Sequence, residues 1–178
     1  YNSIIIKTDS YYRDNIVIRI LSIFLYDIYD RPLSIKKTEI KNTIRTIYKK
    51  NNLVSFSKYD FKTRNSSKLT KNINYKLDNQ FLIIEGIFAH RLDLDHQETI
   101  NIVCEDKKEI CCKRRIKRDK EERGRNIVDV KKKFDKAWYL FYQNIQDYLK
   151  FNKGIRLNLV DKNSYAKLVL NLKKIKNN

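Results

Sequence analysis

Short apolar runs that reach an acidic residue constrain the fold of this chain most strongly. SIIIKTDSYY at 3–12 begins with β-branched residues and reaches Asp9, and QFLIIEGIFAH at 80–90 reaches Glu85. INIVCED at 100–106 is a third run of this type. Continuous apolar runs are typical of strands buried in a parallel sheet. We therefore expect Asp9 and Glu85 at the carboxyl ends of two strands, where open α/β sheets bind ligands.

Helical patterns separate these runs. Isoleucines that follow Pro32 and Ser34 at near-helical spacing predict a helix of about fourteen residues. The pattern over 109–123 is helical and ends at Gly124, and 130–151 reads as a long amphipathic helix whose aromatic residues lie in the core or at a subunit interface. The pattern of residues 162–178 predicts a last helix. Strands that alternate with helices predict an α/β fold, a parallel sheet flanked by helices.

Two further segments are less regular. VSFSKYDFK at 54–62 alternates and is aromatic, which indicates a strand or one arm of a hairpin, and the polar residues at 63–72 indicate a loop or hairpin turn. The stretch 16–29 is strongly apolar and fits no expected element. Because it carries Arg19 and is shorter than the roughly 20 residues of a membrane span, we expect no membrane segment and a cytoplasmic protein. We interpret the whole chain, residues 1–178, as a single domain.

The charge of the chain suggests an anionic partner. Lys and Arg number 39 against 21 acidic residues, a formal net charge of +18. Such an excess favours nucleic acid, an anionic surface or a phosphorylated small molecule. Lys, Asn, Ile and Tyr are all abundant, however, so the positions of the arginines are more informative than the net charge. The three cysteines, Cys104, Cys111 and Cys112, have no metal-ligand spacing, and we expect them to be reduced, buried thiols.

The arginine-rich stretch RRIKRDKEERGR at 114–125 has two interpretations. It contains three pairs of opposite charge at i, i+4 spacing, which would suit a self-neutralising solvent-exposed helix. It would equally suit a lid that closes over phosphates, because guanidinium groups bind phosphate oxygens in pairs. The pairs are Arg115–Asp119, Asp119–Arg123 and Glu121–Arg125.

The chain has few glycines. Only Gly86, Gly124 and Gly154 are present, so neither G-x-G-x-x-G nor G-x-x-x-x-G-K-[ST] can be written anywhere in it. The chain also begins with Tyr1 and contains no methionine. We expect that a first strand and a phosphate loop are absent from this chain.

Five motifs, taken in order, resemble the uridine kinase branch of the uridine kinase and phosphoribulokinase family. The resemblance covers roughly residues 3–140. KTDSYYRD resembles the family's Asp-Ser-Phe-Tyr segment, YDRPLSI its Asn-Phe-Asp-His-Pro segment, KYDFKTR its Tyr-Asp-Phe-x-x-His-Ser-Arg hairpin, IIEGIFA its Glu-Gly-Ile strand end, and RRIKRDKEERGR its lid.

The resemblance implies a role for each matching residue. Asp9 would be the general base on the ribose 5′-hydroxyl, with Tyr12 facing the nucleoside, and Asp30 would accept the ribose hydroxyl protons. Tyr59 and Phe61 would hold the base, and Glu85 would be the carboxylate associated with Mg²⁺. The lid would span about residues 109–130, with C-terminal helices over 130–178. Its arginines would contact the substrate (Arg115 and Arg125) and the phosphates of ATP (Arg118 and Arg123).

The chain departs from the family pattern at three positions. Arg64 replaces the histidine that reads the edge of uracil, Lys133 replaces a glutamine that faces the nucleoside, and Cys111 replaces an arginine of the lid helix. The family's histidine can be neutral or charged, whereas the arginine at position 64 is permanently charged. We nevertheless assign Arg64 to substrate binding. The acceptor is left open by these departures.

The resemblance implies a kinase that uses ATP or GTP with Mg²⁺ to phosphorylate the 5′-hydroxyl of uridine or cytidine in pyrimidine salvage, and a homo-oligomer without specific nucleic-acid binding. Three alternatives stay within the fold: a catalytically impaired relative, a kinase of another acceptor such as a sugar phosphate, and a noncatalytic subunit that associates with an active homologue through residues 130–151. A basic nucleic-acid-binding module is an alternative of a different class.

Overall fold

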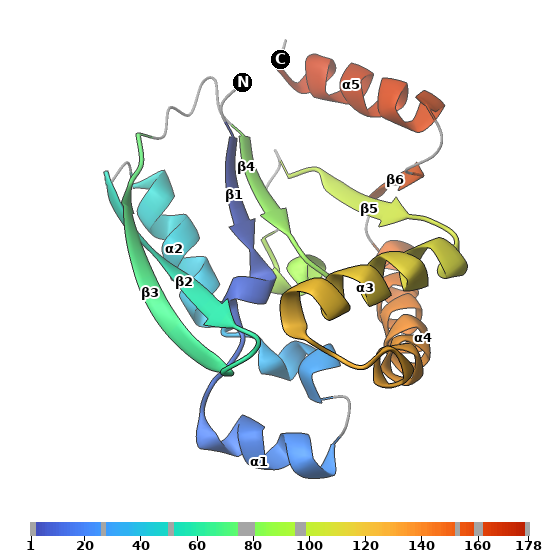
Figure 1. Ribbon diagram of the computed structural model, residues 1–178. Coiled ribbons are helices and arrows are strands. Elements are labelled where there is room, and N and C mark those ends of the chain that lie inside the picture. Colours follow the sequence, from blue (N-terminus) through green and yellow to red (C-terminus); the bar gives the residue numbers. More distant parts are fainter. Residues whose placement is uncertain are drawn as a thin grey trace. The chain divides into compact units, whose positions relative to one another are not determined.

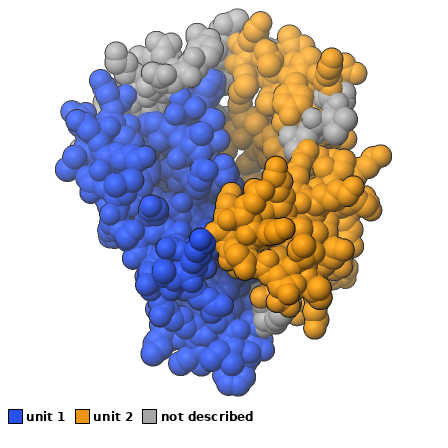
Figure 2. Space-filling model, viewed as in Figure 1, with its two compact units in different colours: residues 1–92 blue, residues 93–178 orange. Residues whose placement is uncertain are grey.

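A computed structural model of the chain describes residues 3–25, 28–49, 52–74, 81–94, 99–151, 154–158 and 162–176. The chain divides into two compact units, residues 1–92 and residues 93–178 (Figure 2). The two units are described separately below. That all 178 residues form one kinase-like domain stays a prediction.

The first unit contains a parallel strand pair, an antiparallel hairpin and two α-helices (Figure 1). Strands β1 (Ser3–Lys7) and β4 (Phe81–Glu85) run parallel, in a register that pairs Ile5 with Ile83 and Lys7 with Glu85. The elements between them are α1 (Ile16–Phe24), α2 (Lys37–Tyr48), β2 (Leu53–Asp60) and β3 (Asn65–Asn72), with short 3-10 turns η1 (Thr8–Tyr11), η2 (Ile28–Asp30), η3 (Pro32–Ser34) and, after β4, η4 (Ala89–Leu92).

Helix α2 packs one apolar face against the hairpin. Its buried positions are Ile40, Thr43, Ile44 and Ile47, which recur at helical spacing as predicted. The Tyr11 hydroxyl donates to Thr43 Oγ1 over 3.2 Å, so the turn that follows β1 is attached to the same helix. The core of this unit therefore lies between α2, β2 and η1.

The predicted loop at 63–72 is wrong for most of its length. Residues 61–64 form the turn, and Asn65–Asn72 form β3, which pairs with the whole of β2 from Asp60↔Asn65 to Leu53↔Asn72. Most side chains of β3 are exposed, so the strand shows no apolar alternation. It is held by its backbone ladder to β2, a feature that hydropathy does not report.

The second unit contains a parallel strand pair and three helices. Its elements are β5 (Asn101–Glu105), α3 (Lys108–Arg123), α4 (Ile127–Phe151), β6 (Gly154–Asn158) and α5 (Lys162–Lys176). Strands β5 and β6 are parallel. The buried side chains Val103, Val130, Phe134, Ile145 and Leu157 form its core. The α/β class with parallel strands flanked by helices is confirmed. Strand β6, only five residues long, was not predicted from the sequence.

The apolar stretch after residue 15 forms helix α1. The Asn15 side chain caps this helix by accepting the N–H of Ile18 over 3.1 Å, and Ile18 is its one buried residue. Most other apolar side chains of α1 are exposed, with Ile23 and Phe24 exposed by 77% and 78%. No helix within the described ranges is both long and apolar enough to cross a membrane.

The prediction of buried thiols is wrong. Cys104 is exposed, and Cys111 and Cys112 are half-buried. All three are free thiols, as expected. Successive side chains of a strand point to opposite faces. In β5 the side chain of Val103 is buried, so that of its neighbour Cys104 points to the other face and is exposed.

Gly86 allows the end of β4 to approach the turn after β1. Its φ of +136° is a conformation that side-chain-bearing residues rarely adopt. A Cβ at this position would lie 1.9 Å from Oγ1 of the fully buried Thr8. The glycine that follows Glu85 is therefore required by close packing against the residue that precedes Asp9.

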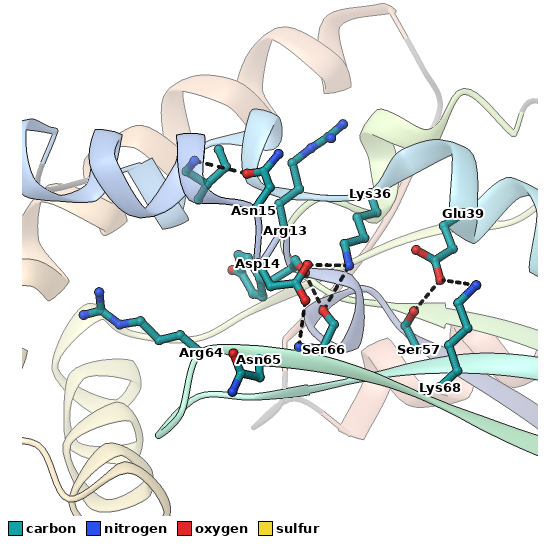
Figure 3. A network of polar contacts seen from close by, with 12 residues as sticks. Arg13, Asp14, Asn15, Lys36, Glu39, Ser57, Arg64, Asn65, Ser66 and Lys68 are labelled. Atoms are coloured by element: carbon teal, nitrogen blue, oxygen red, sulfur yellow. Dashed lines mark hydrogen bonds and ion pairs between the residues drawn. The ribbon is translucent and has the colours of Figure 1, made fainter.

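A polar network fastens the hairpin to the segment after β1 (Figure 3). Asp14 Oδ1 lies 2.9 Å from Lys36 Nζ, and Asp14 Oδ2 accepts the backbone N–H of Ser66 over 3.0 Å. Lys36 Nζ also donates to Ser66 Oγ, which in turn donates to the carbonyl of Tyr12. One carboxylate thus links the segment after η1, the start of α2 and strand β3.

Replacing Gly86 with alanine tests the close approach of β4 to η1. We expect Gly86→Ala to lower the free energy of unfolding by about 3 kcal/mol or more, because it adds backbone strain to an overlap with Thr8. Gly124→Ala is the matched control: its φ is +61° and no atom lies within 4 Å of the added Cβ, so we expect a loss of about 1–2 kcal/mol. Urea unfolding measures both. Equal losses would contradict the proposed contact.

The Asp14 network predicts a pH dependence of stability. Hydrogen bonding to Lys36 holds the pKa of Asp14 down at about 2, from an ordinary value of 3.8. Because the folded pKa is the lower one, this contribution is complete well above pH 4 and is lost as the pH falls toward 2. With allowance for partial exposure, Asp14→Asn should cost about 1–2 kcal/mol at pH 7.

Urea unfolding from pH 7 to pH 2 measures this effect. The difference between wild type and Asp14→Asn should shrink as the pH falls below 4. Asp147→Asn removes a carboxylate that pairs with Lys150 on the exposed surface of α4, and we expect this control to change stability by less than about 0.5 kcal/mol. A difference for Asp14→Asn that does not vary with pH would show that its carboxylate charge is not stabilising.

Candidate active site

Glu85 lies at the carboxyl end of one strand, and Asp9 lies just after the carboxyl end of its neighbour. Glu85 is the last residue of β4 and pairs with Lys7, the last residue of β1, and Asp9 lies in η1 two residues further on. Because β1 and β4 are parallel, both carboxylates lie at the same edge of the strand pair, as predicted. Asp9 is half-buried and Glu85 is exposed. Both predicted catalytic carboxylates of the first unit therefore belong to this edge.

The segment after Asp9 lies alongside the segment that contains Asp30. Tyr12 forms an antiparallel bridge with Ile35, and the Arg13 N–H donates to the carbonyl of Ser34 over 2.7 Å. Asp30 is the last residue of η2. The buried Ser34 hydroxyl donates to the carbonyl of Arg31, the residue after Asp30, over 2.7 Å. These bonds hold the predicted nucleoside-facing and ribose-binding segments next to each other.

Four aromatic rings form a cluster around Tyr12, three residues after Asp9 in the chain. The ring centroid of Tyr12 lies 5.5 Å from that of Tyr59, 5.7 Å from that of Phe61 and 5.9 Å from that of Tyr29. Tyr12 and Tyr59 are buried, and burial raises the pKa of Tyr59 above its ordinary value. Phe61 is half-buried. The predicted base-binding aromatics therefore pack on one another, and Phe61 is the more accessible ring.

Arg64 lies in the hairpin turn beside this cluster. Its guanidinium carbon is 5.8 Å from the ring centroid of Tyr29, within the range of a cation–π contact. Its backbone is left-handed, with φ at 58°. Arg19 of α1 holds this turn by donating from Nη2 to the Arg64 carbonyl over 3.1 Å and to Asn65 Oδ1 over 2.6 Å. A permanent cation is thus placed at the aromatic cluster.

The predicted lid arginines of the second unit converge on one carboxylate. Asp119 is fully buried, and a guanidinium nitrogen from each of four arginines lies within 4 Å of it. The distances to its oxygens are 3.0 Å from Arg118, 3.1 Å from Arg125, 3.5 Å from Arg123 and 3.9 Å from Arg115. We call these five residues the Asp119 cluster.

The end of α3 brings Arg125 back to this cluster. Gly124 adopts a left-handed φ of 61°, which ends the helix, and its N–H and that of Arg125 both donate to the backbone carbonyl of Asp119. The chain therefore turns so that Arg125, six residues after Asp119, reaches the same carboxylate. The predicted stop at Gly124 is confirmed.

The arginines of the Asp119 cluster favour the ionised form of Asp119. Burial opposes ionisation of Asp119, but the charges and hydrogen bonds of Arg123, Arg118 and Arg125 outweigh it and hold the pKa of that carboxyl below its ordinary value. Four guanidinium groups thus lie around this one carboxylate. Such a group can attract a polyanion.

The residues present suit a metal ion that is shared with a substrate. Among the residues that the structure describes, no group of three or more His, Cys, Asp or Glu could hold a metal. Glu85 is a single exposed carboxylate at a strand end. Mg²⁺ in phosphoryl-transfer sites takes one or two protein carboxylates and fills its other positions with waters and phosphates. Glu85 fits such an ion and does not fit a cage made of protein ligands alone.

The predicted site residues fall into two groups. Asp9, Tyr12, Asp30, Tyr59, Phe61, Arg64 and Glu85 belong to the first unit, and the four arginines belong to the second. Sequence reasoning missed Arg19, Tyr29 and the burial of Asp119. Arg19 had a signal, because it is the one charge in the apolar run 16–24. Asp119 had a weaker one, its i, i+4 spacing to two arginines, which equally suited a solvent-exposed helix.

Comparison with known proteins identifies the family. No curated protein matches the chain significantly. The model of the Phosphoribulokinase / Uridine kinase family matches residues 27–151, well over half of the chain. The matched region contains Asp30, the hairpin, Glu85 and the Asp119 cluster, and Asp9 and Tyr12 precede it. The chain therefore belongs to the phosphoribulokinase/uridine kinase family, whose members are kinases.

Proposed function

We propose that this protein transfers the γ-phosphoryl group of a nucleoside triphosphate to the 5′-hydroxyl of a pyrimidine nucleoside, uridine or cytidine. The observation that carries the proposal is the grouping of two carboxylates, an aromatic cluster and a nearby ribose-binding candidate, Asp30, at one edge of a parallel strand pair. The kinase family supports phosphoryl transfer. The aromatic cluster supports an acceptor with a flat ring.

In the proposed reaction, Asp9 accepts the proton of the 5′-hydroxyl as its oxygen attacks the γ-phosphorus. The bond between that phosphorus and the oxygen bridging to the β-phosphate breaks, and the nucleoside diphosphate leaves. A half-buried carboxylate on a turn fixed by Gly86 suits a base that must be held within hydrogen-bond reach of one proton. Asp30 would orient the ribose by accepting its hydroxyl protons.

Charge neutralisation in this proposal comes from Glu85 and the Asp119 cluster. Mg²⁺ held by Glu85 and the phosphates would offset the charge that develops on the leaving group. The arginines of the Asp119 cluster would bind phosphate oxygens, and we assign Arg118 and Arg123 to the triphosphate. Phosphoryl transfer depends mostly on such positioning and electrostatic stabilisation.

A phosphorylated acceptor, such as a sugar phosphate, is the second candidate. Arg64 favours it, because an uncharged nucleoside needs no permanent cation at the aromatic cluster. Arg19, which donates to the same turn, adds a second cation nearby. The nucleic-acid-binding alternative is supported by the net charge and by aromatic residues interleaved with Lys and Arg, and no contact among the described residues adds to it.

Removing the proposed base tests the reaction. We expect Asp9→Asn to lower kcat by about 10³-fold with little change in KM, because a general base contributes 10²- to 10⁴-fold. The readout is nucleoside monophosphate formed from ATP and uridine or cytidine, with Asp147→Asn as a surface control. Because no phosphate-loop motif occurs in these 178 residues, the assay is run on the chain alone and with a strand and phosphate loop joined ahead of it. Absence of Asp9-dependent product in both forms would contradict the proposed function.

A substrate panel decides between the two acceptors. If the acceptor is a nucleoside, Arg64→His should keep or raise kcat/KM for uridine. If it is a sugar phosphate, the same change should lower kcat/KM by about 10-fold or more through loss of a charge-assisted contact. Arg45→His changes an exposed arginine of α2 in the same way and serves as the control. Equal effects of the two variants on every acceptor would exclude Arg64 from acceptor recognition.

A further inference from the structure

Helix α1 turns its apolar face toward solvent. At 3.6 residues per turn, its five exposed apolar side chains fall within an arc of about 120°. They are Ile16, Val17, Ile20, Ile23 and Phe24. The buried residue of the helix, Ile18, points to the opposite side. A surface helix normally packs its apolar face on the core, so α1 is inverted, and its exposed face needs a physical explanation.

Contacts on the other side hold α1 in this orientation. The Asn15 side chain caps the helix by accepting the N–H of Ile18, whose own side chain is buried. Arg19 attaches the helix to the hairpin turn, because its Nη2 donates to the Arg64 carbonyl and to Asn65 Oδ1. The outward direction of the apolar face is therefore fixed by side-chain contacts of the fold.

A contiguous exposed apolar face marks a contact with a protein or with a membrane. The charge of the chain separates these occupants. A formal net charge of +18 makes two copies of the chain repel each other. The same charge attracts the anionic lipids of a membrane surface. A lipid surface offers apolar chains together with negative headgroups, so it matches both the exposed face of α1 and the positive charge.

The surroundings of α1 suit an anionic surface. No acidic residue occurs within 15–25. The hairpin turn bonded to α1 adds two exposed cations, Lys62 and Arg64, and the acid at its start, Asp60, accepts the backbone N–H of Lys62. Residues 1–92 as a whole carry 17 Lys and Arg against 8 Asp and Glu. Positive charge therefore accompanies the apolar face.

We propose that α1 is a membrane-docking helix, which lies in the plane of an anionic bilayer surface. Its two most exposed residues, Ile23 and Phe24, enter the boundary between headgroups and acyl chains, while the neighbouring cations contact the headgroups. A helix of nine residues is too short to span a bilayer, so α1 binds the surface only. The inference does not depend on the proposed function, because α1 contains none of the candidate site residues.

Co-sedimentation of the full chain with lipid vesicles tests the proposal. Vesicles of phosphatidylcholine with about 30% phosphatidylserine are compared with vesicles of phosphatidylcholine alone. We expect binding to the anionic vesicles to be at least about 10-fold stronger, because each cation near an anionic surface adds a favourable interaction. Raising the salt concentration should weaken this binding, because screening shortens the range of the attraction. No binding to the anionic vesicles, or equal binding to both kinds, would overturn the proposal.

Polar substitutions locate the contact on the protein. Ile23→Gln combined with Phe24→Gln should lower the partition coefficient onto the anionic vesicles by about 10-fold or more, because two apolar side chains no longer leave water. The matched control is Val169→Gln combined with Leu170→Gln, which changes a neighbouring pair of exposed apolar residues on α5 in the same way. We expect the control to change the partition coefficient by less than about 2-fold. Equal losses in the two variants would show that α1 is not the contact and would overturn the proposal.

A fluorescent side chain on α1 reports the contact directly, even where the polar variant does not fold, as circular dichroism would show. Trp138 is the one tryptophan of the chain, so Phe24→Trp in a Trp138→Phe background places a single indole on the apolar face. We expect its emission to shift to shorter wavelength with the anionic vesicles and to be quenched by lipids brominated in their acyl chains. Emission that stays unchanged while the protein is bound would overturn the proposal.

Sedimentation velocity without lipid tests a second copy of the chain as the occupant of this face. We expect Ile23→Gln combined with Phe24→Gln to leave the oligomeric state of the wild type unchanged, because charge repulsion opposes pairing of two copies across α1. A dimer that this variant dissociates would show that a second copy covers α1, and it would overturn the proposal.

Discussion

The parallel pairing of β1 with β4 is the constraint on which the proposed active site depends. It brings Asp9 and Glu85, which are 76 positions apart in the chain, to one edge of the strand pair. Gly86 makes the approach possible, because any side chain there would overlap Thr8. The hairpin and the Asp30 segment are then attached to the same turn by backbone hydrogen bonds and by the Asp14 network. The candidate site residues of this unit are therefore positioned largely by backbone contacts.

Arginine and lysine serve two purposes in this strongly basic chain. Lys36 and Arg19 join segments of the first unit to one another through Asp14 and the hairpin turn. Their charges are used within the protein. In the Asp119 cluster four arginines surround one buried carboxylate, and our proposal assigns Arg118 and Arg123 to the triphosphate. Net charge does not separate these purposes, whereas the ratio of cations to carboxylates at each cluster does.

Much of the fold could be predicted from local patterns. The apolar runs at 3–7 and 81–85 form β1 and β4 as predicted, but their predicted burial is wrong, since Ile6 is the one buried residue of the two strands and Ile5, Phe81 and Ile83 are exposed. The stop of α3 followed from Gly124, the residue best suited to a left-handed φ. Strand β3 could not be predicted, because its exposed polar side chains leave no pattern and its partner is found only after the hairpin closes. Helix α1 was not predicted. An apolar run normally indicates a buried element, whereas most apolar side chains of α1 are exposed.

The sequence by itself determined the residue types of the candidate site and the family to which they belong, because carboxylates at strand ends, hairpin aromatics and paired arginines are local in the chain. Only the tertiary structure decided which of them share a surface. Tyr12 and Tyr59 turned out to pack on each other, and Asp119 turned out to be enclosed by arginines. A spacing of four residues places two charges side by side on a helix but carries no information on whether water reaches them. Burial is set by the side chains that close around a residue, and for Asp119 the return of Arg125 after the turn supplies one of them.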